Sequence, residues 1–336
     1  QKNGMFQFQL TIWFSRINMT TFKNIVGIKI KHLSADPPAP TVGQIWYNTT
    51  TKVVKGAING LGAWASGGNL NTGRQNLGSN GLQTAALAFG GQVGSTFKGE
   101  TELYNGSAWT ELNDLNAARS YVRGLGVSTA ALCVAGITPP ATRVAVVESF
   151  NGTSWTEVND LNQVRRSGHA IGTTAAGLYF AGNIPPNTGK TESWNGTSWT
   201  EVNDLNTARD ALGGGGTAAL GLAAGGQTGP GIQVESWDGT SWTETTDMNA
   251  KKVSHGSAGL TQDAVLVFGG EVAPTNLTES WNGTAWTEVG DMAAGTYGIT
   301  GTGTSTLALA AGRNPNSQAT EEWTVTDFTP KTFDTD

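Results

Sequence analysis

The sequence predicts an all-β protein built from six copies of one segment, and three observations support this prediction. A tryptophan recurs at intervals of 45, 46, 44, 43 and 44 residues. Its positions are Trp64, Trp109, Trp155, Trp199, Trp242 and Trp286. Only 14% of the 336 residues are charged and 47 are glycine, a composition that favours short strands and tight turns over helices. A fixed period of this size indicates a solenoid, a propeller or an array of repeats.

Each copy predicts the same elements in the same order. A strand with Trp-Thr-Glu comes first, as in Ser154 to Val158, and an Asn-Asp-Leu-Asn turn follows. A glycine-rich segment that starts near a basic residue leads to an apolar strand ending in a small residue and glycine. A last strand then ends in an aromatic residue. The small-glycine pairs are Gly90-Gly91, Ala135-Gly136, Ala181-Gly182, Gly225-Gly226, Gly269-Gly270 and Ala311-Gly312. The aromatic residues are Tyr104, Phe150, Trp194, Trp237, Trp281 and Trp323.

A tight turn is predicted between each aromatic residue and the next repeated tryptophan. The turn dipeptides are Asn105-Gly106, Asn151-Gly152, Asn195-Gly196, Asp238-Gly239 and Asn282-Gly283. Such dipeptides accept the positive φ that a tight hairpin requires. The flanking aromatic residues are therefore expected to pack across paired strands.

The two ends of the repeat series are out of phase. Trp64 opens the series with its own Asn59-Gly60, whereas Trp323 is followed by neither Asn-Gly nor a second tryptophan. The last repeat therefore lacks a fourth strand, and the first supplies one too many. We expect the strand around Trp64 to pair beside the strand around Trp323, which would close a ring and remove two exposed sheet edges.

Three regions are predicted along the chain. Residues 1–40 form an N-terminal tether that ends in a stiff, proline-rich linker, Leu33 to Pro40. The repeats occupy residues 41–325, and residues 326–336 form a C-terminal tail. Met19 stands in a context typical of a natural start. Residues 1–18 are therefore open to two interpretations, upstream sequence or part of the mature protein.

Composition argues against several classes of function. The net charge of −6 is unlike that of a nucleic-acid-binding surface, which carries a basic patch. No stretch approaches the roughly 18 apolar residues of a membrane span. Cys133 is the only cysteine, so no internal disulfide can form, and its apolar neighbours predict a small buried core residue.

These repeats resemble the kelch repeat, whose blades are about 50 residues long. Kelch blades carry an apolar strand ending in Gly-Gly, an aromatic residue followed by Asp or Asn, then Trp, then Leu or Met, then Arg. One copy here reads Gly225-Gly226, Trp237-Asp238, Trp242, Met248 and Lys252. The resemblance covers about residues 59–323 and implies a six-bladed, kelch-like β-propeller.

A second resemblance lies in Pro40 to Lys52, which includes Gly-Gln-Ile-Trp-Tyr-Asn. This segment is similar to one common in tail-fibre and other virion structural proteins of bacteriophages, especially marine ones. There a similar hairpin often precedes Asn-Gly-Trp repeats. The resemblance implies a virion component, such as a tail fibre, an appendage or a capsid-decorating protein, made in the host cytoplasm.

A basic residue recurs ten positions after each repeated tryptophan in five copies. These residues are Arg74, Arg119, Arg165, Arg209 and Lys252, and the sixth position is Thr296. One interpretation is a cationic ring that binds an anion at a channel mouth. The other, which we favour, is structural, with salt bridges or carbonyl contacts that tie blades together. An acidic residue five positions after tryptophan recurs as Asp114, Asp160, Asp204, Asp247 and Asp291.

No catalytic residue, metal site or cofactor is predicted. The segment around Asp238 looks like a sialidase box, but its Asp and Gly are adjacent where that box separates them. His32, His169 and His255 have no partner at a metal-ligand spacing. His169 and His255 occur in similar contexts, which suggests one shared position in the repeat. Gly213 to Gly216 is expected to serve blade packing.

The loops after the small-glycine pairs differ between copies and are the best candidates for recognition. These variable loops are Gln92 to Gly99, Ile137 to Arg143, Asn183 to Lys190, Gln227 to Ile232, Glu271 to Asn276 and Arg313 to Ser317.

We therefore expect a non-enzymatic virion structural protein, present in several copies or as a homo-oligomer. Residues 1–40 would bind other virion proteins, and the propeller would contact a host-surface glycan or protein, or dock on the particle. A carbohydrate-binding or carbohydrate-active propeller outside a virion, secreted or at a cell surface, is one alternative. A kelch-type interaction scaffold is another.

Overall fold

The computed structural model describes residues 30–37, 44–58, 62–273, 275–325 and 329–333. Every regular element in these residues is a β-strand. The chain divides into two compact units, Gly62–Thr324 and a smaller unit from Gln1–Leu61 with Val325–Asp336. Predictions about residues 1–18 and about Asn59-Gly60 concern positions outside the described residues.

The larger unit contains six four-stranded antiparallel sheets among its described residues. Sheet one is β5 (Gly78–Leu82), β6 (Ala85–Phe89), β9 (Thr101–Tyr104) and β10 (Trp109–Leu112). Sheet two is β11 (Arg123–Val127), β12 (Ala130–Val134), β15 (Val147–Phe150) and β16 (Trp155–Val158). Sheet three is β17 (His169–Gly172), β18 (Gly177–Phe180), β19 (Thr191–Trp194) and β20 (Trp199–Val202).

The other three sheets repeat this order of strands. Sheet four is β21 (Gly213–Gly216), β22 (Gly221–Ala224), β23 (Val234–Trp237) and β24 (Trp242–Glu244). Sheet five is β25 (Gly256–Thr261), β26 (Ala264–Phe268), β27 (Thr278–Trp281) and β28 (Trp286–Glu288). Sheet six is β29 (Thr300–Gly303), β30 (Leu307–Arg313), β31 (Ser317–Thr324) and β4 (Ala63–Ser66). Short hairpins β7–β8 (Gln92–Val93, Thr96–Phe97) and β13–β14 (Ile137–Thr138, Thr142–Arg143) lie in two variable loops.

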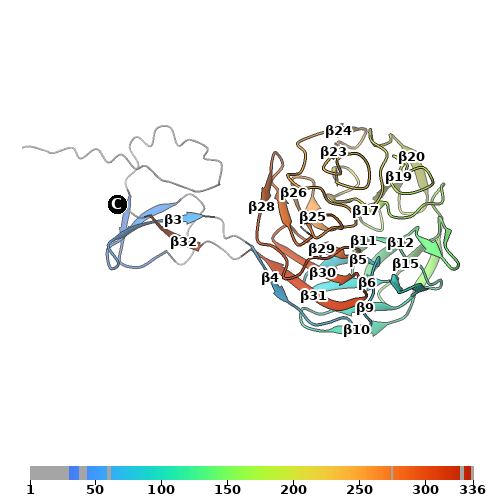
Figure 1. The fold of residues 1–336 in the computed structure, drawn as a ribbon, viewed down its shortest axis with the longest axis horizontal. Helices are drawn as coiled ribbons and strands as arrows, with labels where there is room; N and C mark the ends of the chain where they lie inside the picture. Colours follow the sequence, from blue (N-terminus) through green and yellow to red (C-terminus); the bar gives the residue numbers. More distant parts are fainter. Residues whose placement is uncertain (1–29, 38–43, 59–61, 274, 326–328, 334–336) are drawn as a thin grey trace, which may run out of the picture. The chain divides into compact units, whose positions relative to one another are not determined.

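The first strands of the sheets lie near a common centre. Figure 1 shows β5, β11, β17, β25 and β29 there, with β10, β20, β24 and β28 at the rim. Each first strand contacts the first strands of two other sheets, in the order β5, β11, β17, β21, β25 and β29 and back to β5. The all-β prediction is therefore confirmed, and the arrangement is propeller-like.

The expected pairing of the first and last repeats is present. β4 pairs antiparallel with β31, and Trp64 lies opposite Trp323. The two rings are 5.5 Å apart between centroids. Trp64 also packs its ring edge-on against Phe268 of sheet five at 4.7 Å. A strand from the start of the repeat series thus completes sheet six.

The hairpins between third and fourth strands differ from the expected two-residue turn. In sheet two, Phe150 pairs with Trp155, which leaves a four-residue connection. Only the glycine in it has a positive φ, 92° at Gly152. Asn151 instead accepts the backbone N–H groups of Thr153 and Ser154 through Oδ1. The aromatic pairing across the hairpin is as expected, with 5.0 Å between the rings of Phe150 and Trp155.

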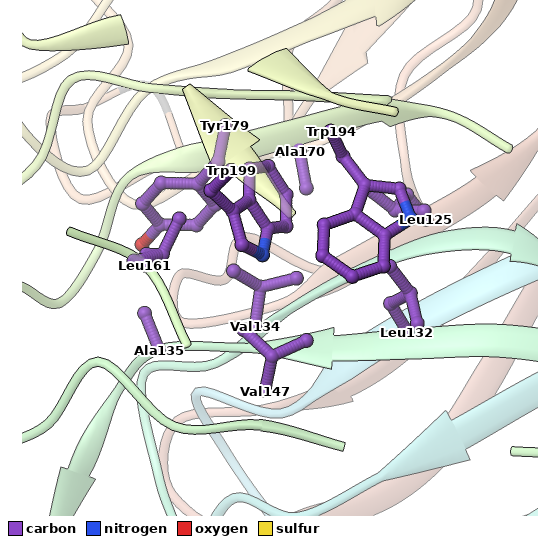
Figure 2. Close-up of a cluster of buried hydrophobic side chains, with 10 residues drawn as sticks. All are labelled: Leu125, Leu132, Val134, Ala135, Val147, Leu161, Ala170, Tyr179, Trp194 and Trp199. Atoms are coloured by element: carbon purple, nitrogen blue, oxygen red, sulfur yellow. The ribbon is translucent and has the colours of Figure 1, made fainter. Parts of the chain in front are cut away.

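The apolar core lies between successive sheets. Figure 2 shows one such cluster, in which Leu132 of sheet two lies beside Trp194 of sheet three, and Val134 and Val147 lie beside Trp199. Burying such side chains stabilises the fold by about 1.5–3 kcal/mol each. Cys133 is a free, buried residue in the neighbouring cluster, as predicted. Burial raises the pKa of its thiol to about 12.

A hydrogen bond from the repeated tryptophan links adjacent sheets. Trp155 of sheet two donates its indole N–H to Thr101 Oγ1, the first residue of β9 in sheet one, at 3.0 Å. The same bond joins Trp64 to Thr278, Trp109 to Thr320 and Trp242 to Thr191. Valine replaces this threonine in two sheets, at Val147 and Val234. The two tryptophans that would have used those hydroxyls therefore lack the bond.

Those two tryptophans differ in whether the indole N–H finds another acceptor. Trp286 donates to the backbone carbonyl of Thr246 instead, at 3.1 Å. Trp199 Nε1 is buried without a partner, and Figure 2 shows it facing Val134 and Val147. A buried donor without an acceptor carries a desolvation penalty.

The smaller unit is a four-stranded sheet. β1 (Lys31–Leu33) is parallel to β2 (Ile45–Asn48), which forms a hairpin with β3 (Val53–Ile58), and β3 pairs with β32 (Thr329–Phe333). Asp36 accepts hydrogen bonds from Trp46, Asn48 and Lys55. The bonds from Lys55 and Asn48 lower the pKa of its carboxyl to about 2.

This unit corrects the expected division of the chain. We expected the repeats to begin at residue 41. Instead β2 and β3 belong to a separate sheet, in which β2 pairs with β1 and β3 pairs with β32. The described part of the expected tail, 329–333, is a strand of the same sheet. The physical reason is that β3 has backbone hydrogen-bonding groups along both of its sides, and these must be paired. β2, from the N-terminal part of the chain, pairs on one side, and β32, from the C-terminal part, pairs on the other. The larger unit begins at Gly62 and ends at Thr324.

The unpaired indole of Trp199 yields a stability prediction. Val147→Thr places a hydroxyl where the threonine of four other sheets accepts this bond. We expect the free energy of unfolding to rise by about 1 kcal/mol, the net worth of one hydrogen bond. Val267→Thr is the control, because Val267 is equally buried but lies in sheet five, in a cluster that does not include Trp199. Urea denaturation of both variants measures the effect, and equal destabilisation by the two would contradict it.

Candidate functional site

The recurring cations are buried within the sheets. In sheet two, Arg119 donates from Nη2 to Glu148 Oε1 at 2.9 Å and from Nη1 to the carbonyls of Ala135 and Val146. Asn116 donates from its backbone and side chain to the other carboxylate oxygen, at 2.7 and 2.8 Å. We call this arrangement the Asn–Arg–Glu cluster. Arg119 is fully buried and Glu148 is 1% exposed.

The cluster recurs with local changes. The equivalent ion pairs are Arg74–Glu102, Arg165–Glu192 and Arg209–Glu235. In sheet five, Lys252 donates to the carbonyls of Gly269 and Leu277, while Asn249 binds Glu279. In sheet six Thr296 replaces the cation, and Glu321 pairs with Arg313 at 2.9 Å instead.

This geometry corrects the alternative of a cationic ring at a channel mouth. Arg74, Arg119, Arg165 and Arg209 are each 0% exposed, and Lys252 is 1% exposed. Burial against carboxylates and carbonyls keeps them away from any ligand. The structural interpretation fits, and each of the four arginines is paired with the glutamate on the third strand of a sheet. The recurring aspartates have another role, since Asp114 and Asp160 accept the N–H of the first residue of β9 and β15.

A central cavity lies where the six first strands meet. Its volume is about 100 Å³, and residues of all six sheets line it. Glycine and small side chains make up most of the lining, because six strands converge here. Its larger polar side chains are Asn80, Arg123, His169 and His255, and none of its lining residues is Asp or Glu.

Arg123 is the single charged residue of this lining. The equivalent positions on the other first strands are Gly78, His169, Gly213, Gly256 and Thr300. Its Nη1 donates to the carbonyl of Val122 at 3.1 Å. Among the described residues no carboxylate lies within salt-bridge distance of it. Burial lowers the pKa of its guanidinium.

The two cavity histidines do not share one repeat position. His169 pairs with Phe180, whereas Gly256 pairs with Phe268, so His255 lies one residue earlier on its strand. Both imidazoles flank β21. A Cβ on Gly213 would lie 2.6 Å from His255 Nε2, and one on Gly214 would lie 3.3 Å from His169 Cδ2. The tetraglycine strand therefore gives room to two imidazoles.

Both imidazoles are neutral at neutral pH. Burial, reinforced by the nearby charge of Arg123, lowers the pKa of His169 to about 3. Burial and the charge of Lys252 lower the pKa of His255 well below its usual value. His169 Nδ1 and both ring nitrogens of His255 have no hydrogen-bond partner. These three nitrogens are closed off from solvent as well as unpaired.

One end of the cavity is framed by six left-handed residues, one from each sheet. They are Asn76, Tyr121, Ser167, Ala211, Ser254 and Gly298, with φ between 54° and 62°. Each donates its N–H to the carbonyl of the preceding one, and Asn76 donates to Gly298, so the six bonds form a cycle. These residues line a small cavity of about 10 Å³, to which Arg123 also contributes. That volume holds about one water molecule.

Several variable loops contact their neighbours. Arg143 donates to Asn183 in the next loop, and Asn187 donates to the carbonyl of Gln227 in the loop after that. Gly94 donates its N–H to Asn316 Oδ1. These contacts connect the loops of sheets two, three and four with one another, and the loops of sheets one and six, into connected surfaces.

In the described part of the chain, no group of three His, Cys, Asp or Glu residues comes together as a metal site requires. The same residues include no helix with the length and apolarity needed to span a membrane. Comparison with protein-family models and with curated proteins finds no match for this sequence.

The buried clusters predict a contrast between two neighbouring glutamates. Glu192 on β19 pairs with Arg165 and is 1% exposed, whereas its cross-strand neighbour Glu201 is exposed and pairs with Lys190. Glu192→Gln leaves a buried guanidinium uncompensated, so we expect a loss of about 3 kcal/mol in the free energy of unfolding. Glu201→Gln should change it little, because solvent screens an exposed pair. Similar losses for both, measured by chemical denaturation, would contradict the cluster's role.

Proposed function

We propose that the larger unit is a six-bladed, kelch-like β-propeller whose ring is closed by β4. The cycle of backbone bonds through Asn76 and Gly298 supports this, since it needs all six sheets side by side. The β4–β31 pairing supports it from the rim. Closure leaves only the short outer strands of the sheets as edges for pairing with other chains.

The proposed role is a non-enzymatic structural protein of a bacteriophage particle. The Gly-Gln-Ile-Trp-Tyr-Asn segment ahead of Asn-Gly-Trp repeats is the observation that carries it. Its last four residues, Ile45 to Asn48, form β2 of the smaller unit. That unit would bind another virion protein, and the propeller would be displayed on the particle or docked against it.

The way the reactive groups are used supports a non-enzymatic role. The repeated carboxylates are bound to Asn and Arg in the scaffold clusters. The cavity histidines are neutral, and no carboxylate lines the cavity to serve as an acid or a base beside them. General acid–base catalysis requires such a group within hydrogen-bond reach of the substrate.

Two faces of the propeller offer different surfaces. The variable loops form one of them and suit recognition of a host-surface glycan or protein. The hairpins between first and second strands lie at the opposite end of the antiparallel strands. Exposed aliphatic side chains recur there in five sheets: Leu82, Val127, Leu220, Leu260 and Leu307. Apolar groups around one face favour docking against protein.

A carbohydrate-binding propeller outside a virion is the second candidate. The connected surface of the variable loops favours it, because unlike loops on a rigid ring can form a specific site. Glycan-array binding that is lost when Gln227 to Ile232 is replaced by Gly-Ser residues would support recognition by this face.

Mass spectrometry and electron microscopy of purified phage particles test the virion role. We expect this chain in stoichiometric amount and a ring-shaped density with six lobes on the particle surface. Particles assembled without it should lack that density. Absence of the chain from intact, infectious particles would overturn the proposal.

A further inference from the structure

The central cavity contains a charge that the fold leaves unmatched. Arg123 is the only charged residue in a lining drawn from six strands, and no acidic residue is among them. The charge of Asp210 acts on the pKa of Arg123, but Asp210 is held by Asn187 at 3.0 Å and lies outside the cavity lining. Arg123 is half-buried, and a guanidinium that has lost much of its solvent is normally paired, because desolvating an unmatched charge is costly.

Neutral polar groups surround that charge. Both side-chain amide atoms of Asn80, both ring nitrogens of His255 and Nδ1 of His169 are buried without a partner. Asn80 is 5% exposed and His255 is 3% exposed. All of these groups are neutral, so none of them supplies a counter-charge for Arg123.

The volume limits the class of ligand. At about 100 Å³ the cavity holds a few water molecules or one small ion. Pockets for drug-sized molecules start at about 300 Å³, so a sugar chain would not fit inside. A single positive charge, neutral neighbours and no carboxylate in the lining together suit a small oxyanion.

We propose that the central cavity binds one small oxyanion, held by the guanidinium of Arg123 beside the neutral ring of His169. The shared chemistry is a compact group with two or more negatively charged or partly charged oxygens. Arg guanidinium groups bind such oxygens in pairs. An inorganic phosphate or sulfate and a small carboxylate are the two sources. This site does not depend on the virion role.

The site uses residues at which the repeats differ. Arg123 and His169 occupy positions where three other strands carry glycine. Those glycines leave the space around the axis open. An asymmetric ligand site thus forms inside a nearly symmetric scaffold.

The test is titration of the full-length protein with phosphate, sulfate and acetate at constant ionic strength and pH 7. Calorimetry and thermal unfolding are compared for the wild type, Arg123→Gln and Arg143→Gln. Arg143 is the matched control, because it is an arginine of the same region that lies in a loop outside the cavity. We expect one saturable site in the wild type and in R143Q, and at least tenfold weaker binding in R123Q.

The anion series identifies the source. Tighter binding of phosphate or sulfate than acetate would assign an inorganic oxyanion, and the reverse order would assign a carboxylate. Either order supports the site. Non-specific salting effects act equally on all three proteins and cancel in the comparison.

A direct measurement covers the case in which R123Q does not fold. Nitrogen-15 NMR of the wild type should show the Arg123 Nε and His169 ring signals moving during the titration with one common affinity. No saturable response, equal affinity in R123Q, or shifts confined to surface residues would overturn the proposal.

Discussion

The buried carboxylate on the third strand of each sheet is the constraint on which the rest of the structure depends. A charge in that position is tolerated only if it is paired and fully hydrogen-bonded. Asn and Arg of the preceding connection satisfy it, as Asn116 and Arg119 do for Glu148. The cluster therefore fixes how the chain passes from the rim of one sheet to the centre of the next. It explains why Leu-Asn-x-x-Arg and Glu recur together.

The centre of the molecule follows from that attachment. The left-handed residue lies two positions after each cation, as Asn76 does after Arg74, so the clusters place six such residues side by side. Their cycle of backbone bonds then unites the sheets. Where the pattern breaks, the fold compensates locally. Arg313 pairs with Glu321 where Thr296 replaces the cation, and the Thr246 carbonyl replaces a threonine hydroxyl for Trp286.

Local patterns in the sequence predicted the strands, their order and the pairing of Trp64 with Trp323. Those features depend on residues that are neighbours along the chain or at matching ends of a repeat. The partner of Arg119 was not predictable in this way, because both Asp and Glu recur and only three-dimensional packing selects Glu148. The histidines were misaligned because Ser-Gly-His and Ser-His-Gly differ by one residue, which reverses the side of a strand. The cavity site was missed since it lies where the copies disagree. The only signal of this site in the sequence was Arg123, which stands at a position where three other sheets have glycine.

The central claim is that one cycle of backbone bonds joins six sheets into a single closed ring. Native-state hydrogen exchange tests it most directly, because it measures the opening free energy of each amide. The amides of Asn76, Tyr121, Ser167, Ala211, Ser254 and Gly298 should exchange at closely similar slow rates, through global unfolding. Far faster exchange at Asn76, the donor that closes the cycle onto sheet six, than at Ser167 and Ala211 would show an open seam and contradict this account.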